Sequence, residues 1–139
     1  MTDTEATSNE RPLNIIVTEK HPLARAALVS LLGADGFHVL QAENVGAATF
    51  FITSVDHLAV LLVDLELQGW RSLVRYALTR GALVIAMEGD HPISEMYDLA
   101  QRGITACFEK PITYDEVRTA IKQNLAVQES SNLARSQAR

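Results

Sequence analysis

Charged residues follow the apolar segments of this chain at the points where predicted strands end. Asp64 closes the unbroken apolar run 58–63, which is typical of a strand buried on both faces of a parallel sheet. Such a strand presents its last residue at the carboxyl edge of the sheet, where open α/β proteins place their sites. Asp64 is therefore the first functional candidate. The alternative is that Asp64 only caps the segment that follows it.

Further charges occupy equivalent positions after other apolar segments. They are Glu19 and Lys20 after 13–17, Glu88 after 83–87, and Lys110 after 105–109. Because parallel strands all end at the same edge of a sheet, these side chains are expected to lie close to Asp64. The alternative is that they are ordinary solvated loop ends. Their convergence on one rim favours a site.

The elements that must position these charges alternate between strand and helix. Helices are predicted where apolar residues repeat on one side, and a capping box at 113–116 begins the last of them. The predicted strands are 13–17, 37–42, 58–63, 83–87 and 105–109, and the helices are 21–33, 43–55, 71–79, 91–102 and 114–125. This alternation predicts an α/β fold with a five-stranded parallel sheet covered on both faces.

Composition limits the class of protein. The 139 residues suit one domain, and a net charge of -5 with a pI near 5.3 argues against a nucleic-acid partner. The single cysteine, Cys107, excludes an internal disulfide. No apolar run is long enough to cross a membrane, so the cytoplasm is the expected location. We expect a disordered tail over 1–12, a domain over 13–127, and over 128–139 a polar tail or linker stub, mobile unless it extends the last helix.

Four short motifs carry a resemblance to a known family. They are Glu-Lys-His-Pro-Leu at 19–23, Asp-Leu-Glu-Leu-Gln-Gly at 64–69, Ala-Gln-Arg-Gly-Ile at 100–104 and Phe-Glu-Lys-Pro at 108–111. In this order and spacing they resemble the signatures of response-regulator receiver domains, the CheY-like family. The resemblance covers about 13–125, nearly the whole predicted domain.

The resemblance implies a flavodoxin-like, doubly wound three-layer sandwich with strand order 2-1-3-4-5. It also implies a two-component phosphorelay in which a histidine kinase supplies a phosphoryl group to Asp64. In that chemistry a magnesium ion offsets the phosphate charge, and Lys110 pairs with a phosphoryl oxygen. The family further implies a cis Lys110–Pro111 bond.

The sequence departs from the family's pattern at three positions of the site. Glu19 matches the first acid of the metal-binding pair, but Lys20 stands where the second acid should be. Glu88 falls at the Thr or Ser switch position, and Cys107 falls at the switch aromatic. These departures predict an atypical, degenerate receiver.

Lys20 changes the expected charge of the pocket. A protonated lysine has no lone pair to give a metal, so we expect its ammonium to pair with Asp64 and replace the metal's charge. We therefore predict no cofactor and no bound magnesium, which only a competent pocket would hold. Any ligands would come from Glu19, Asp64 and Glu66.

The expected function is signalling by protein–protein interaction and not catalysis. A histidine kinase or another signalling protein is the expected partner, without nucleic acid or membrane. A homodimer through the face made by the fourth helix, fifth strand and last helix is also expected. That face carries Met96, Tyr97, Arg102, Glu109, Tyr114, Asp115, Arg118 and Lys122. The alternatives are a functional phosphoacceptor, an aspartate-nucleophile phosphatase using Asp64-Leu65-Glu66, and a small-ligand binder on a flavodoxin-like fold.

Overall fold

Five parallel strands form a single sheet in the order β2-β1-β3-β4-β5. The computed structural model describes residues 12–89 and 98–137. The strands are β1 (Asn14–Thr18), β2 (His38–Ala42), β3 (Leu58–Asp64), β4 (Leu83–Glu88) and β5 (Ala106–Glu109). The predicted doubly wound α/β fold is therefore confirmed, and the strands begin and end within a residue or so of the predicted bounds.

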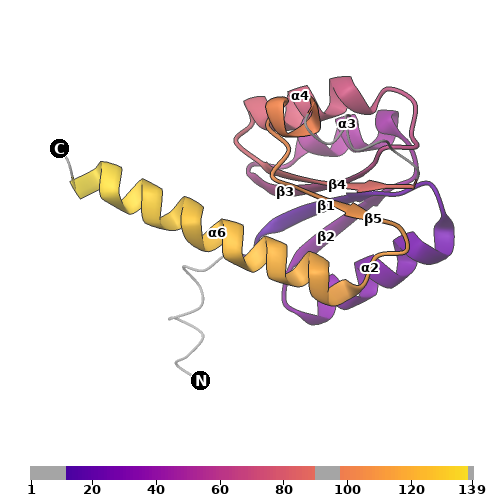
Figure 1. Cartoon of the computed structure of the whole chain (residues 1–139), viewed down its shortest axis with the longest axis horizontal. Coiled ribbons are helices and arrows are strands. Elements are labelled where there is room, and N and C mark those ends of the chain that lie inside the picture. Colours follow the sequence, from indigo (N-terminus) through magenta and orange to yellow (C-terminus); the bar gives the residue numbers. More distant parts are fainter. Residues whose placement is uncertain (1–11, 90–97, 138–139) are drawn as a thin grey trace.

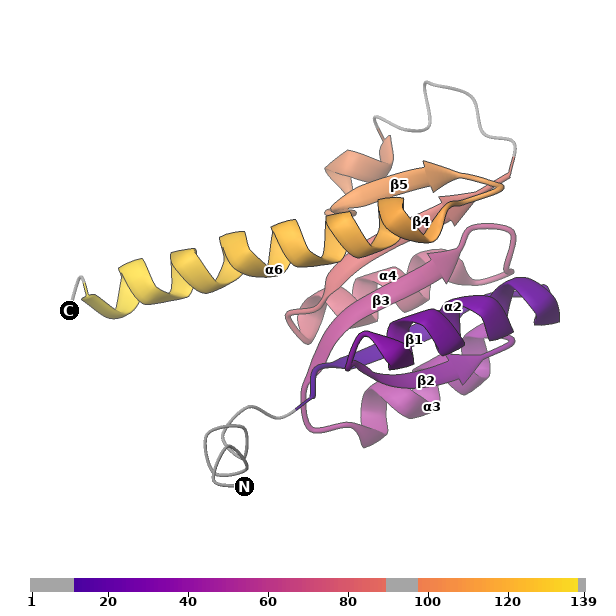
Figure 2. The same cartoon turned by 90° about the horizontal axis from the view of Figure 1, so that it is seen from below.

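Helices cover both faces of the sheet (Figure 1). On one face lie α2 (Pro22–Ala34) and α6 (Tyr114–Gln137), and on the other lie α3 (Val45–Ser54) and α4 (Trp70–Thr79). Residues 98–101 are also helical. Viewed from below, α2 and α6 lie over the same face of the sheet (Figure 2).

Alternating side chains of the central strand build two separate cores. All seven residues of β3 are buried. Leu61 packs in the cluster under α3 and α4, which contains Ile52 and Leu73. Leu62 packs in the cluster under α2 and α6, which contains Leu32 and Ile121. Burying one such side chain contributes about 1.5–3 kcal/mol, so the sheet that carries Asp64 is rigidly held from both sides.

The last helix is longer than the predicted domain. It begins after a capping box in which the Thr113 hydroxyl donates to Glu116 Oε1 at 3.1 Å and accepts the Glu116 N–H at 3.4 Å. It continues through Gln137. Residues 128–137 therefore extend the last helix, which was the stated alternative to a mobile tail. The outer part of α6 projects away from the sheet (Figure 1).

Some predictions fall on residues outside the described ranges. They concern the N-terminal tail through residue 11 and the fourth-helix residues Ile93, Met96 and Tyr97. Among the helices of residues 12–89 and 98–137, none is both long and apolar enough to span a membrane.

Candidate functional site

Three strand ends bring one lysine and its carboxylates together. The Lys110 ammonium lies 2.9 Å from Asp64 Oδ1, 3.4 Å from Glu19 Oε2 and 3.2 Å from Glu66 Oε2. Asp64 is the last residue of β3, and Glu19 and Lys110 follow β1 and β5 directly. The predicted convergence of Asp64, Glu19 and Lys110 at the carboxyl edge is therefore confirmed.

Backbone N–H groups fix the two buried carboxylates. Asp64 Oδ1 accepts the N–H of Glu66 at 2.9 Å, and Asp64 Oδ2 accepts the N–H of Lys20 at 3.1 Å. Glu19 Oε2 accepts the N–H of His21 at 3.0 Å. Asp64 thus does cap the turn after β3, as the structural alternative held, and it also faces Lys110.

The Lys20 side chain does not make the pair that its position suggested. Its backbone N–H contacts Asp64, but the residue is exposed. Within the part of the chain that the structure describes, its ammonium makes no ion pair with Asp64. The physical reason is that an exposed ammonium keeps its hydration, whereas the buried Asp64 carboxylate already has a counter-charge 2.9 Å away. Lys110 supplies the positive charge instead.

The contact between Glu66 and Lys110 was not predicted from the sequence. We expected Glu66 only as an alternative metal ligand, yet its carboxylate binds Lys110 and lies 3.9 Å from His21 Nε2. Its side chain keeps 37% of its surface exposed, whereas Asp64 is fully buried. The turn stabilised by Asp64 brings residue 66 back over the site, so its spacing two residues after Asp64 was the available signal.

Burial and hydrogen bonding separate the two inner carboxyl groups. Burial, and then the hydrogen bond with Asp64, raise the pKa of Glu19 above its usual 4.5. Burial by itself would raise the pKa of Asp64 too. Hydrogen bonds from Glu19, the Glu66 N–H and Lys110 outweigh burial and hold the pKa of Asp64 below 3.8. As the pH falls, Glu19 is therefore the first of the two carboxylates to take up a proton, and Asp64 is the last.

The two switch positions lie on the neighbouring strands. Glu88 ends β4, is nearly buried, and its carbonyl accepts the Lys110 N–H at 2.7 Å. Cys107 in β5 is partly buried. Burial, and then the charge of Glu88, raise the pKa of the Cys107 thiol to about 11. An ionised Glu88 cannot donate a hydrogen bond to an anion, and a neutral thiol is only a weak donor.

The residues present do not fit the magnesium ion that the family uses. No group of three or more His, Cys, Asp or Glu side chains within 12–89 and 98–137 is arranged to hold a metal. The Lys110 ammonium already lies among the three nearest carboxylates. Lys20, at the position of the second acid, has no lone pair when protonated. Magnesium takes oxygen ligands in near-octahedral order, and here the Lys110 ammonium occupies the space between the carboxylates that would supply them.

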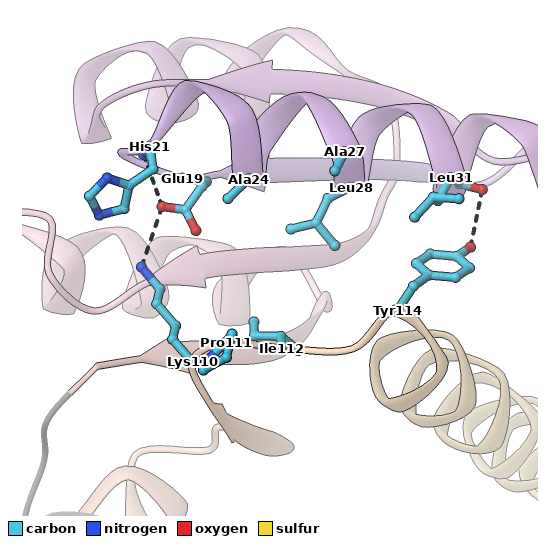
Figure 3. Close-up of a pocket in the computed structure, with 10 residues that line it drawn as sticks. All are labelled: Glu19, His21, Ala24, Ala27, Leu28, Leu31, Lys110, Pro111, Ile112 and Tyr114. Atoms are coloured by element: carbon cyan, nitrogen blue, oxygen red, sulfur yellow. Dashed lines mark hydrogen bonds and ion pairs between the residues drawn. The ribbon is translucent and has the colours of Figure 1, made fainter.

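An apolar groove of about 460 Å³ opens beside the charge cluster, between α2 and the segment after β5 (Figure 3). Its apolar wall consists of Ala24, Ala27, Leu28, Leu31, Pro111 and Ile112, and Glu19 and Lys110 lie at one end. At the other end the Tyr114 hydroxyl contacts Leu31 O at 3.2 Å and Asp35 Oδ2 at 2.6 Å. The Lys110–Pro111 bond is cis, as predicted.

Solved receiver domains share this fold. The CheY-like response-regulator receiver domain from Methanospirillum hungatei gives a TM-score of 0.79 at 19% identity, over 87% of this chain and 99% of that one. The signal receiver domain of a Luxo repressor protein from Vibrio parahaemolyticus gives 0.80 at 16% identity, over 89% and 98%. The chain therefore has the fold of the CheY-like receiver domains, as its motifs predict.

Curated proteins of related sequence are sensor kinases. The chain is 28% identical over 127 residues to the sensor histidine kinase RcsC of Escherichia coli, covering 88% of this chain. It is 29% identical over 130 residues to RcsC of Salmonella typhi, covering 91%. The chain spans 13% of the length of these relatives. No protein-family model matches it.

Proposed function

We propose that this chain is a receiver-like signalling domain of a two-component pathway that acts by protein–protein interaction, with little or no magnesium-dependent phosphorylation at Asp64. Its fold and its similarity to the sensor histidine kinase RcsC support the pathway. A histidine kinase or another signalling protein is the partner that this assignment implies.

The observation that carries the proposal is the closed charge cluster around Lys110. Asp64 is fully buried, and both of its oxygens are engaged, Oδ1 by Lys110 and the Glu66 N–H and Oδ2 by the Lys20 N–H. A donor phosphate would have to displace these contacts. A phosphoryl group would also add about -1.5 to -2 charge beside Glu19 and Glu66, with no ligand set for magnesium to offset it.

The switch positions also argue against a phosphate-driven change of state. Glu88 repels an added anion when ionised, and Cys107 offers only a weak S–H donor. A ligand that does not distinguish two states cannot shift the balance between them. The domain on this proposal keeps one conformation and binds its partner in it.

The test is to incubate the protein with acetyl phosphate and magnesium, and to follow intact mass and oligomeric state together. We expect no stable phosphoryl adduct and no change in oligomeric state. Asp64→Asn is the matched control, because it removes the acceptor while keeping the side-chain volume. A stable adduct on the wild type that is absent from Asp64→Asn would contradict the proposal, and a change of oligomeric state with it would show a phosphate-driven switch.

A double variant tests the same proposal in the opposite direction, by a gain of phosphorylation. Lys20→Asp restores an acid at the second metal-ligand position, and Glu88→Thr supplies a hydroxyl at the switch position. The double variant is expected to accept phosphate at Asp64 more readily than the wild type, measured by the same mass shift. No gain in the double variant would show that these two positions are not the cause of the degeneracy.

The second candidate function is an ordinary phosphoacceptor response regulator. The 2.9 Å contact between Lys110 and Asp64 favours it, because a lysine in this place can neutralise a phosphoryl oxygen. The acetyl phosphate experiment decides between the two functions, since only the second yields an adduct on the wild-type chain.

A further inference from the structure

A second groove, of about 380 Å³, lies between α4 and the segment 98–102 and shares no lining residue with the Asp64 cluster. We call it the arginine groove. Its lining consists of Arg71, Val74, Arg75, Leu78, Thr79 and Arg102. Three arginines therefore line one concavity on a chain whose formal net charge is -5.

Local structure places these arginines on two sides of the groove. Arg71 and Arg75 lie one helical turn apart on the exposed side of α4, whose other side is buried through Leu73 and Ala77. Arg102 comes from the end of the helical segment 98–101, where Gly103 adopts a φ of 95°. A Cβ on Gly103 would lie 3.1 Å from Leu78, so this glycine allows the close approach that sets Arg102 beside α4.

Among the described residues, two of the three arginines have no acidic partner. Within the described ranges, neither Arg71 nor Arg75 pairs with a carboxylate; Arg71 instead stacks on the Trp70 ring at 4.5 Å. Arg102 pairs with Asp98 at 3.0 Å on its own helical turn. Other arginines have structural roles: Arg80 donates to the carbonyl oxygens of Ile52 and Val55. Arg71 and Arg75 therefore remain available to an external anion.

We propose that the arginine groove docks an acidic segment of a partner protein. Two carboxylates of that segment pair with Arg71 and Arg75, and an apolar side chain between them rests on the partly exposed Leu78. The apolar floor favours a peptide over an inorganic anion, which would leave that floor uncovered. The inference assumes the proposed function only in taking the partner to be a signalling protein. It does not depend on phosphorylation, because the groove is separate from Asp64.

The test uses a synthetic peptide of alternating Glu and Leu residues as the acidic probe. Trp70 is the chain's single tryptophan and lies under Arg71, so its fluorescence should report an anion that engages Arg71. We expect a saturable change in Trp70 fluorescence at low ionic strength, and weaker binding at 0.5 M NaCl. The reason is that salt screens exposed charges: the screening length is about 10 Å at 0.1 M salt and shorter at higher salt. Calorimetry gives an independent affinity.

Arg75→Glu is the diagnostic variant, since it reverses a groove charge and leaves the Arg71–Trp70 reporter in place. Lys122→Glu, an exposed change of equal charge on α6, is the matched control. We expect at least a tenfold loss of affinity for Arg75→Glu and less than a threefold loss for Lys122→Glu, with circular dichroism showing that both are folded.

Three outcomes would overturn the docking site. They are no saturable binding by the wild type, equal losses in the two variants, or binding of inorganic phosphate or RNA but not of the acidic peptide. The result is independent of the phosphorylation test. An adduct at Asp64 would contradict the proposed function alone, whereas equal losses would remove the docking site alone.

Discussion

Lys110 is the residue on which the charge balance of the carboxyl edge depends. It is the nearest cation to three carboxylates, two of which are almost completely buried, and its own side chain is only 18% exposed. Burial lowers the pKa of Lys110, but the contact with Asp64 and the charge of Glu19 outweigh it and raise the pKa above 10.5. The ammonium is therefore charged at neutral pH.

Replacing Lys110 by methionine should destabilise the protein, because it leaves Asp64 buried beside Glu19 without a counter-charge. Removing one partner of a buried pair costs about 3–5 kcal/mol. Because the lysine is partly exposed, we expect a loss at the lower end, about 3 kcal/mol of unfolding free energy at pH 7. Urea unfolding at several pH values measures it, and Lys122→Met, on an exposed residue, should lie within about 0.5 kcal/mol of the wild type.

The pH dependence gives this prediction its sign. The depressed pKa of Asp64 contributes stability that is present above its unfolded value of 3.8 and is lost as the pH falls through the folded value. The variant loses the part of that contribution that Lys110 supplies, so the gap in unfolding free energy between wild type and Lys110→Met should narrow as the pH falls from 3.8 towards the folded value. A gap that is constant across this range would show that Lys110 stabilises the fold only by packing.

Residue types and strand order predicted which groups meet, but not where every side chain points. Asp64, Glu19 and Lys110 follow strands directly, so topology alone places them at one edge. Lys20 follows β1 too, yet a flexible side chain on a turn can leave in either direction, and only the backbone N–H faces Asp64. The Glu66 contact depended on the turn after Asp64, which the sequence pattern did not define.

At the scale of elements, the start of α6 is fixed by its capping box. Thr113→Ala removes the side chain that pairs with Glu116 and accepts its N–H, and such a cap is worth about 1 kcal/mol. We expect that loss in urea unfolding. The control is Thr119→Ala on the exposed side of α6, which should be neutral or slightly stabilising because alanine has the higher helix propensity. Equal losses at both positions would contradict a capping role.

The end of α6 shows what composition cannot decide. Residues 128–137 are polar, and a polar stretch is compatible with either a tail or a solvated helix, because no buried face is required to continue a helix already nucleated. By contrast, the buried strands were predicted almost to the residue, since an apolar run such as 58–63 is too short for a buried helix and has the length of a strand buried on both faces. Patterns therefore predict elements best where burial constrains both faces.

At the scale of the whole molecule, one sheet separates two hydrophobic clusters. Ile52 of α3 belongs to the cluster on one face, and Ile121 of α6 belongs to the cluster on the other. Alternation of strand and helix predicted this layering, but the strand order 2-1-3-4-5 came from the motifs, because alternation alone is compatible with other windings. Among the described residues, no buried side chain belongs to both clusters.

This separation predicts additive stability effects across the sheet. Ile52→Val and Ile121→Val each remove one methyl group from a fully buried side chain and should each cost about 1 kcal/mol. Because the two sites lie in different clusters, the double variant should lose the sum of the two free energies within about 0.5 kcal/mol, in one cooperative urea transition.

The comparison pair is Ile16→Val combined with Ile52→Val, two residues of one cluster, between which coupling is allowed. A coupling across the sheet larger than that within the cluster would contradict two independent cores, and two separate transitions would show that the faces unfold as distinct units.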